Sequence, residues 1–234
     1  MKQNLQQNTK FVENVFNKVY NKYDLMNDLM SFGVHRIWKK KLIYMINPSE
    51  HQTLLDVGCG TGDIGLLYSK ATKNKSTITS VDPNEKMIKK GMNRLKEFKN
   101  IKWKVCPAEK LDVPDETFDF YTISFGLRNT KNIKQSLDEA FRVLKKGGRF
   151  FCLEFSKIDN SKLNYLYKLY SKSIPMIGRY VVGEKGPYEY LIKSIDQFLN
   201  QDELIYAMEN QGFTNCKYLN LNGGIVAIHS GWKL

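Results

Sequence analysis

Residues 55–65 read LDVGCGTGDIG, in which three glycines alternate with other residues directly after an aspartate. The β-rich run TLLDV (53–57) precedes this loop and an amphipathic segment near 63–72 follows it. The loop is therefore expected at a strand-to-helix turn, where ligands bind at the edge of an open α/β sheet. Its spacing is G-x-G-x-G, not the G-x-G-x-x-G of dinucleotide-binding turns, and no GK[ST] follows, which excludes a P-loop.

The loop suits a zwitterionic ligand better than a phosphate. Backbone N–H groups of a tight glycine turn can bind a carboxylate, and the aspartate ahead of them can bind an ammonium group. Another aspartate ends the run TITSVD (77–82), at the distance expected for a carboxylate that binds both ribose hydroxyls. S-adenosylmethionine carries all of these groups, so we predict it as the cofactor rather than a bare glycine-rich turn. The residues predicted to bind it are Asp56, Gly58, Gly60, Thr61, Gly62 and Asp82.

The adenine is expected between the third and fourth strands. The segment CPAEKL (106–111) is placed to meet it, with the Ala108 N–H as donor. Pro83 and Met87 are expected to pack against its faces, and Ser124 to face the same cleft. Each of these residues also fits an ordinary core or turn position.

Strands and helices alternate from residue 53 onward, which is typical of βαβ units and a parallel sheet. We predict an α/β fold of the class I methyltransferase (Rossmann-like) type, with a mainly parallel seven-stranded sheet closed by a C-terminal antiparallel hairpin. A single domain, 1–234, divides into four parts: a helical lid (1–50), a cofactor-binding core (51–156), a helical insertion (157–200), and a final helix and hairpin (201–234). The expected strands are 53–57, 77–82, 101–105, 118–125, 148–155, 216–221 and 224–232, and the expected helices lie at 9–46, 63–72, 84–98, 132–145, 160–200 and 201–210.

Composition narrows the location and the partners. The 234 residues have a net charge of +12, and no apolar run reaches the roughly 18 residues of a membrane span. The polar start MKQNLQQNTK does not resemble a signal peptide, so we expect a cytoplasmic protein. The charge is compatible with an anionic membrane surface or nucleic acid, or with a lineage rich in Lys and Asn. The four cysteines are widely spaced, so neither a metal site nor a disulfide framework is predicted.

The methyl acceptor is constrained by the segment that follows the fourth strand. SFGLRN (124–129) stands where many amine methyltransferases have an [N/D]PP[Y/F] loop, which disfavours an amine acceptor. Arg128 at the cleft mouth is a candidate partner for an acceptor oxyanion, with Asn129 beside it, because a guanidinium suits oxygen ligands. The alternative for Arg128 is a helix cap or a surface ion pair.

The chain resembles the ubiquinone/menaquinone biosynthesis C-methyltransferase family from end to end. The segments that carry the resemblance are VFNKVYNKYDLMNDLMSFGVHRIWKK (15–40), LDVGCGTGD (55–63), FDFYTISFGLRN (118–129), RVLKKGGRFFCLEFSK (142–157), PMIGRYVVGEKGPYEYLIKSI (175–195) and GGIVAIHSGWK (223–233). The resemblance implies methyl transfer from S-adenosylmethionine to a ring carbon of a polyprenylated quinol. One departure is Pro107, where the family usually has Asn or Asp; proline removes a backbone donor at this adenine contact.

The resemblance also implies roles for individual residues. Arg128, helped by Asn129, is expected to stabilise the phenolate that makes the ring carbon nucleophilic. Candidates for the general base lie in the N-terminal segment expected to cover the site; these are Tyr23, Asp24 and His35, and we prefer none of them.

Several alternatives and partners stay open. The rival functions are methylation of RNA or another small molecule, and a non-catalytic S-adenosylmethionine-binding subunit of a quinone-biosynthesis complex. The expected partners are the quinol, an anionic inner-membrane surface at its cytoplasmic face, and other quinone-biosynthesis enzymes; a homodimer is left open, and no nucleic acid is expected. Segment 163–182 could line a channel for the polyprenyl tail, rest on headgroups, or pack as a plain helix.

Overall fold

The computed structural model describes Asp28, Ser31 and residues 33–158, 160–182 and 186–234. Seven strands form one sheet in the order β3-β2-β1-β4-β5-β7-β6. β1 to β5 run parallel, and β7 runs antiparallel to both β5 and β6. Their bounds are β1 Leu54–Val57, β2 Ile78–Asp82, β3 Ile101–Val105, β4 Phe118–Ser124, β5 Leu144–Phe155, β6 Thr214–Leu221 and β7 Val226–Lys233. The predicted fold class, including the closing hairpin, is confirmed.

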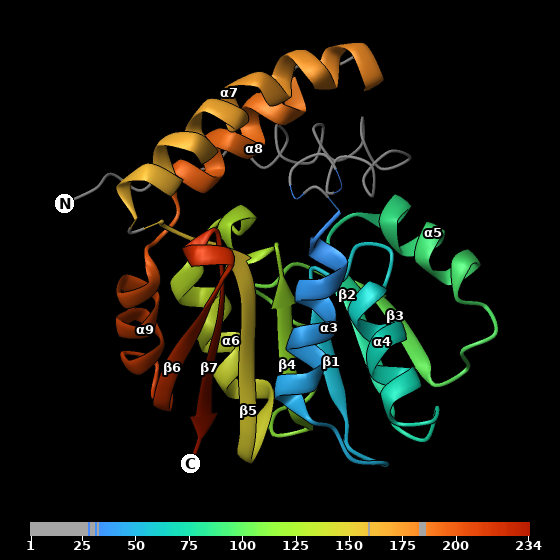
Figure 1. The fold of residues 1–234 in the computed structure, drawn as a ribbon. Helices are drawn as coiled ribbons and strands as arrows, with labels where there is room; N and C mark the ends of the chain where they lie inside the picture. The colour runs from blue at the N-terminus through green and yellow to red at the C-terminus, as the bar shows by residue number, and fades with distance from the viewer. Residues whose placement is uncertain (1–27, 29–30, 32, 159, 183–185) are drawn as a thin grey trace.

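Helices connect the strands as the alternating pattern predicts. Their bounds are α3 His35–Ile46, α4 Asp63–Ala71, α5 Glu85–Arg94, α6 Ile133–Val143, α7 Ser161–Val182, α8 Gly186–Gln197 and α9 Gln201–Glu209, with short 3-10 turns η2 Leu127–Asn129 and η3 Asn222–Gly224. The helical insertion contains α7 and α8, which Figure 1 shows side by side across the end of the sheet toward which β4 points. No described helix is both long and apolar enough to cross a membrane.

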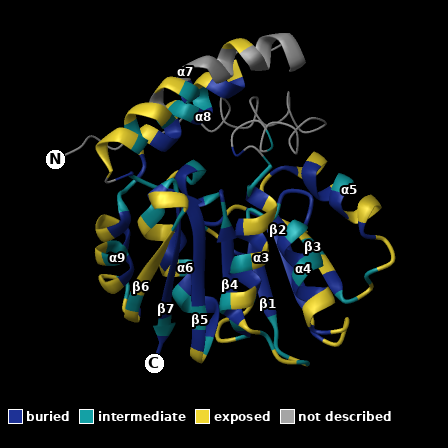
Figure 2. Cartoon of the chain, in the orientation of Figure 1, coloured by how far each residue is buried: buried dark blue, intermediate teal, exposed yellow. Residues whose placement is uncertain are grey.

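Two apolar layers enclose the sheet, because successive side chains of a strand point to opposite faces. Apolar residues of α3 and α4 pack on one face, against side chains such as Leu54 and Ile78, and apolar residues of α8 join the same cluster from the end of the sheet (Figure 1). Apolar residues of α6 and α9 pack on the other, against Leu55 and Val81. The central strands are buried along most of their length, as Figure 2 shows, so the ligand-binding loops at their ends rest on a rigid base.

Several boundaries differ from the prediction. The helix expected over 84–98 ends at Arg94, and a turn at Gly33 and Val34 interrupts the segment expected as one helix over 9–46.

Two further differences fall at glycines. β5 begins at Leu144, four residues before the predicted start at Gly148, because Leu144 already pairs with Phe118 of β4. Gly147 takes a positive φ of 76° in this stretch, where the register of the ladder shifts. The hairpin between β6 and β7 closes through η3, in which Asn222, Gly223 and Gly224 all have positive φ. Trp38 Nε1 donates a hydrogen bond of 2.6 Å to Asn222 Oδ1, which ties α3 to this turn.

Candidate active site

The glycine loop lies between β1 and α4 and is held against the end of β2. The Cys59 N–H donates to the Val81 carbonyl at 3.0 Å, and the Gly60 N–H donates to Asp82 Oδ2 at 2.9 Å. Gly60 has a φ of 55°, a conformation that costs glycine little and most other residues more. The predicted strand–loop–helix turn is confirmed, and Asp82 is its anchor as well as a candidate ligand.

The third glycine of the loop, Gly62, allows the Trp103 side chain to pack closely against the backbone. A Cβ on Gly62 would lie 2.4 Å from the Trp103 ring, and one on Gly91 would lie 2.5 Å from the same ring. Trp103 of β3 therefore sits over two glycines, one at the start of α4 and one inside α5. The role predicted for Gly62, contact with the cofactor, is not needed to explain why the position is glycine.

A small cavity of about 20 Å³ opens beside the loop. Sequence reasoning identified five of its lining residues, but it missed the charged residues Lys39 and Asp63. The lining consists of Lys39, Asp56, Gly58, Cys59, Gly60, Thr61, Asp63, Ile64, Ser124 and Phe125. Ser124 ends β4 here, next to the loop, and its Oγ is buried without a hydrogen-bond partner among the described residues.

Asp56 is a buried carboxylate with one oxygen available. It lies opposite Thr122 in the β1–β4 ladder, and Thr122 Oγ1 donates to Asp56 Oδ1 at 3.0 Å. Asp56 Oδ2 is buried and has no hydrogen-bond partner within the described part of the chain. Burial raises the pKa of this carboxyl to about 7, because a charge is costly away from water. An ammonium group would satisfy the open oxygen and favour the ionised form, so the site fits the amino group of S-adenosylmethionine.

Asp82 ends β2 with both oxygens already bound to backbone. Oδ1 accepts from the Asn84 N–H at 2.8 Å, and Oδ2 accepts from the Gly60 N–H. Burial raises the pKa of Asp82 to about 6. A carboxylate oxygen can accept more than one hydrogen bond, so Asp82 fits the ribose diol while it holds the loop.

The residues predicted around the adenine flank the end of the sheet near β2 and β3. Met87 on α5 and Ala108 after β3 are buried, whereas Pro83 and Pro107 are exposed. Their adenine contacts stay predictions.

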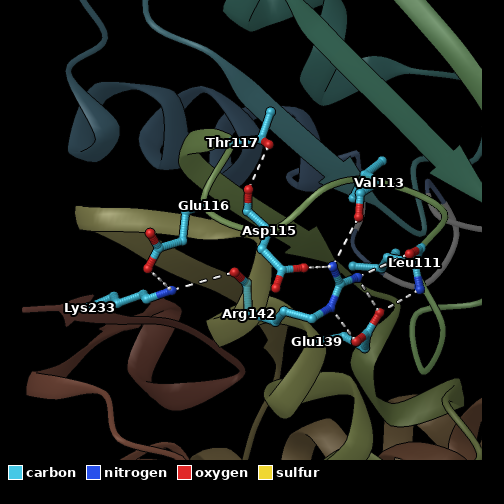
Figure 3. A network of polar contacts seen from close by, with 8 residues as sticks. All are labelled: Leu111, Val113, Asp115, Glu116, Thr117, Glu139, Arg142 and Lys233. Carbon is cyan, nitrogen blue, oxygen red and sulfur yellow. Dashed lines mark hydrogen bonds and ion pairs between the residues drawn. The ribbon is translucent and has the colours of Figure 1, made fainter.

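A polar network holds the loop that carries Ala108 (Figure 3). Arg142 of α6 donates to the carbonyls of Leu111 and Val113, each at 3.0 Å, and pairs with Glu139 and Asp115. Glu139 Oε2 in turn accepts from the Leu111 N–H at 2.6 Å. The guanidinium thus binds three points of one loop, which favours a defined loop conformation at the adenine side.

Arg128 and Asn129 lie together on η2, below α8. Arg128 is 7% exposed; its Nη1 donates to the Phe125 carbonyl at 2.8 Å and pairs with Glu154 of β5. Asn129 Oδ1 accepts from the Tyr190 hydroxyl of α8 at 3.1 Å. Burial raises the pKa of Glu154, although Arg128 opposes that shift. Sequence reasoning missed Glu154 and Tyr190, because neither is close to Arg128 along the chain.

The predicted base candidates fall in two groups. Tyr23 and Asp24 lie outside the described residues. His35 begins α3, is 3% exposed, and its Nε2 lies 2.9 Å from Asp28 Oδ1. Burial lowers the pKa of His35, because the charged imidazolium is costly away from water, so burial opposes the protonation that a general base must undergo. Among the described residues no cluster of His, Cys, Asp or Glu is arranged to hold a metal ion.

Comparisons with known proteins show the family of this chain. The model of the ubiE/COQ5 methyltransferase family matches residues 2–233. The chain is 48% identical over 230 residues to a protein of Rickettsia bellii named ubiquinone/menaquinone biosynthesis C-methyltransferase UbiE, covering 95% of this chain and 92% of that protein, and 48% identical to its counterpart in Rickettsia akari.

Solved structures similar to this one share its fold. A SAM-dependent methyltransferase from Aquifex aeolicus superposes with a TM-score of 0.66 at 17% identity, covering 89% of this chain and 97% of that one. A possible histamine N-methyltransferase from Thermotoga maritima superposes with a TM-score of 0.67 at 19% identity, covering 95% and 100%.

Proposed function

This chain belongs to the ubiE/COQ5 methyltransferase family, and we propose that it methylates a ring carbon of a polyprenylated quinol in ubiquinone and/or menaquinone biosynthesis. The observation that carries the proposal is the pair of carboxylates beside the glycine loop, of which Asp56 is buried and Asp82 half-buried. Asp56 offers an open oxygen to an ammonium, and Asp82 offers a second carboxylate on the next strand. When bound, S-adenosylmethionine supplies an electrophilic methyl group on its sulfonium.

The residues around η2 are suited to the acceptor ring. A quinol carbon becomes nucleophilic when the neighbouring hydroxyl loses its proton, so a cation near the developing phenolate lowers the barrier. We assign this role to Arg128, with Asn129 held beside it by Tyr190. Glu154 of β5 balances the charge of the buried guanidinium in the free protein, and the ion pair holds the Arg128 side chain in place. A buried cation without such a partner would be costly.

The proposal is tested by following the methyl group. The purified protein is incubated with S-adenosylmethionine labelled at the methyl group and with short-chain demethylated benzoquinol or naphthoquinol. We expect the label on a ring carbon of at least one acceptor, located by NMR of the product. Label found only on an oxygen of the quinol, or only on RNA supplied in a parallel reaction, would contradict the proposal.

The role of Arg128 requires variants that do not leave Glu154 unpaired. Arg128→Lys keeps the charge, and the double variant Arg128→Met/Glu154→Gln removes both charges together. We expect the double variant to lose about 100-fold in kcat with unchanged S-adenosylmethionine affinity, and Arg128→Lys to lose less. Turnover near the wild-type rate in the folded double variant would exclude the phenolate role.

We also propose that the protein contacts anionic membranes through α7. Four large apolar residues of this helix are exposed to solvent by 58% or more, which is unusual for residues without a partner surface. They are Tyr165, Leu166, Leu169 and Met176. The net charge of +12 favours an anionic leaflet, where a polyprenylated substrate resides.

A further inference from the structure

Lys39 is a buried cation beside the glycine loop. It projects from α3, is 7% exposed, and lines the cavity together with Asp56 and Ser124. Its Nζ donates to Asp63 Oδ2 at 2.7 Å. Taking an ammonium out of water is costly unless it is paired. The burial of Lys39 therefore indicates a role inside the protein, not a place in a solvated basic surface.

Asp63 is shared between two cations, which leaves positive charge at this side of the cavity. Its other oxygen, Oδ1, accepts from Arg94 Nη2 of α5 at 2.6 Å. Burial raises the pKa of Asp63, but Lys39 and Arg94 outweigh it and hold the value at about 2. Asp63 is therefore ionised, and the group of Lys39, Arg94 and Asp63 carries a net charge of about +1 by formal count.

A carboxyl group, that of Asp56, borders the same cavity. Asp56 has an unpartnered oxygen there, and the charge of Lys39 opposes the rise in the Asp56 pKa that burial causes. With Asp56 ionised, as an adjacent ammonium favours, the two sides of the cavity differ in sign, as the two ends of an amino acid do. An ammonium group has three N–H donors, and Asp63 accepts one of those of Lys39.

We propose that Lys39 binds the α-carboxylate of the methionine moiety of S-adenosylmethionine, while Asp56 binds the α-amino group. This assignment rests on the proposed function, because it deepens the description of the cofactor site. It places a ligand contact on α3, in the helical segment that precedes the cofactor-binding core. Asp63 then acts as a positioning residue that orients the Lys39 ammonium.

Three ligands separate the contacts in a binding experiment. S-adenosylmethionine carries both charged groups, its decarboxylated form keeps only the amino group, and 5′-methylthioadenosine has neither. Each is titrated calorimetrically into the wild-type protein, Lys39→Met, Lys39→Gln and the control Lys40→Met, whose side chain is exposed. We expect both Lys39 variants to bind S-adenosylmethionine at least tenfold more weakly, with the affinity for the other two ligands changed less than twofold. Lys40→Met should match the wild type for all three.

The outcomes distinguish this inference from the function itself. Equal loss of affinity for all three ligands would make Lys39 a scaffold residue and overturn the inference. A wild-type protein that binds none of the ligands would contradict the proposed function instead. Lys39→Gln retains a donor for Asp63, so it reports on the charge if Lys39→Met does not fold.

Discussion

At the scale of the residue, the ionisation of Asp56 links cofactor binding to pH. The free carboxyl has a pKa raised to about 7 by burial, while an adjacent ammonium favours its ionised form. Binding must therefore release a proton in the range where the free carboxyl is protonated. We expect the affinity for S-adenosylmethionine to fall as the pH drops from about 8 to 6, by up to about tenfold per pH unit below the pKa.

Calorimetry at several pH values, in buffers of different ionisation enthalpy, measures both the affinity and the proton release. Lys39 and Asp63 face the same cavity, but the pKa of Asp63, at about 2, keeps its titration outside this window. Asp82 has a pKa of about 6, so its protonation should cause a second loss of affinity at the lower end of this pH range. Asp56→Asn should bind weakly at every pH and show no step near pH 7. A wild-type affinity that does not change between pH 6 and 8 would contradict the assignment.

Sequence reasoning found the residues that belong to one local motif and missed those that meet across the fold. Asp56 and Asp82 stand at the ends of recognisable strands, so their common edge was predictable. Lys39 of α3 belongs to the site through its ion pair with Asp63. Glu154 of β5 belongs to it through its ion pair with Arg128. Both pairs form only when the chain has folded. A lysine in a basic run such as HRIWKKK carries no sign that it is buried.

At the scale of the element, the contact between Trp103 and two glycines couples β3, α4 and α5. Gly91→Ala should lower the free energy of unfolding by about 1–3 kcal/mol, although alanine favours a helix over glycine by up to about 1 kcal/mol. The added Cβ would lie 2.5 Å from the Trp103 ring and 3.2 Å from the Thr61 carbonyl. Because Thr61 lines the cavity, we expect weaker cofactor binding as well.

Urea denaturation of Gly91→Ala, Trp103→Leu and the double variant measures this coupling. The smaller side chain makes room for the Cβ, so alanine should cost less in the Trp103→Leu background than in the wild type. Strictly additive effects on the free energy of unfolding would show that the ring does not oppose the substitution.

The elements themselves were largely predictable, since strand and helix patterns alternate regularly from residue 53 to residue 155. Two outcomes at glycines were not predictable from the local sequence. The fifth strand was expected to begin at Gly148, but it begins at Leu144, directly after α6 ends at Val143. The third glycine of the loop is predicted to contact the cofactor, which stays a prediction, and the structure places it beside the ring of Trp103, 41 positions away. Neither outcome follows from local propensity, because tertiary packing decides both.

At the scale of the whole molecule, membrane contact should need both the net charge and the exposed apolar residues of α7. Electrostatic attraction is screened within about 10 Å at 0.1 M salt, and burial of a leucine side chain contributes up to about 2–3 kcal/mol. We therefore expect binding to vesicles that contain anionic lipid and little binding to neutral vesicles. Binding should fall steeply between roughly 50 and 300 mM salt, because the screening length shortens over this range.

The double variant Leu166→Ser/Leu169→Ser tests the apolar part at constant charge. Both leucines are exposed on α7, so the substitutions should leave the free energy of unfolding nearly unchanged. We expect sedimentation with anionic vesicles to weaken about tenfold or more, as partial insertion of two leucines implies. Tyr206→Ser on α9 removes an equally exposed apolar residue from another part of the surface and should bind like the wild type. If both variants lose binding equally, or neither does, α7 is not the contact surface. Binding that persists at high salt would exclude the electrostatic part, because only screened charges respond to ionic strength.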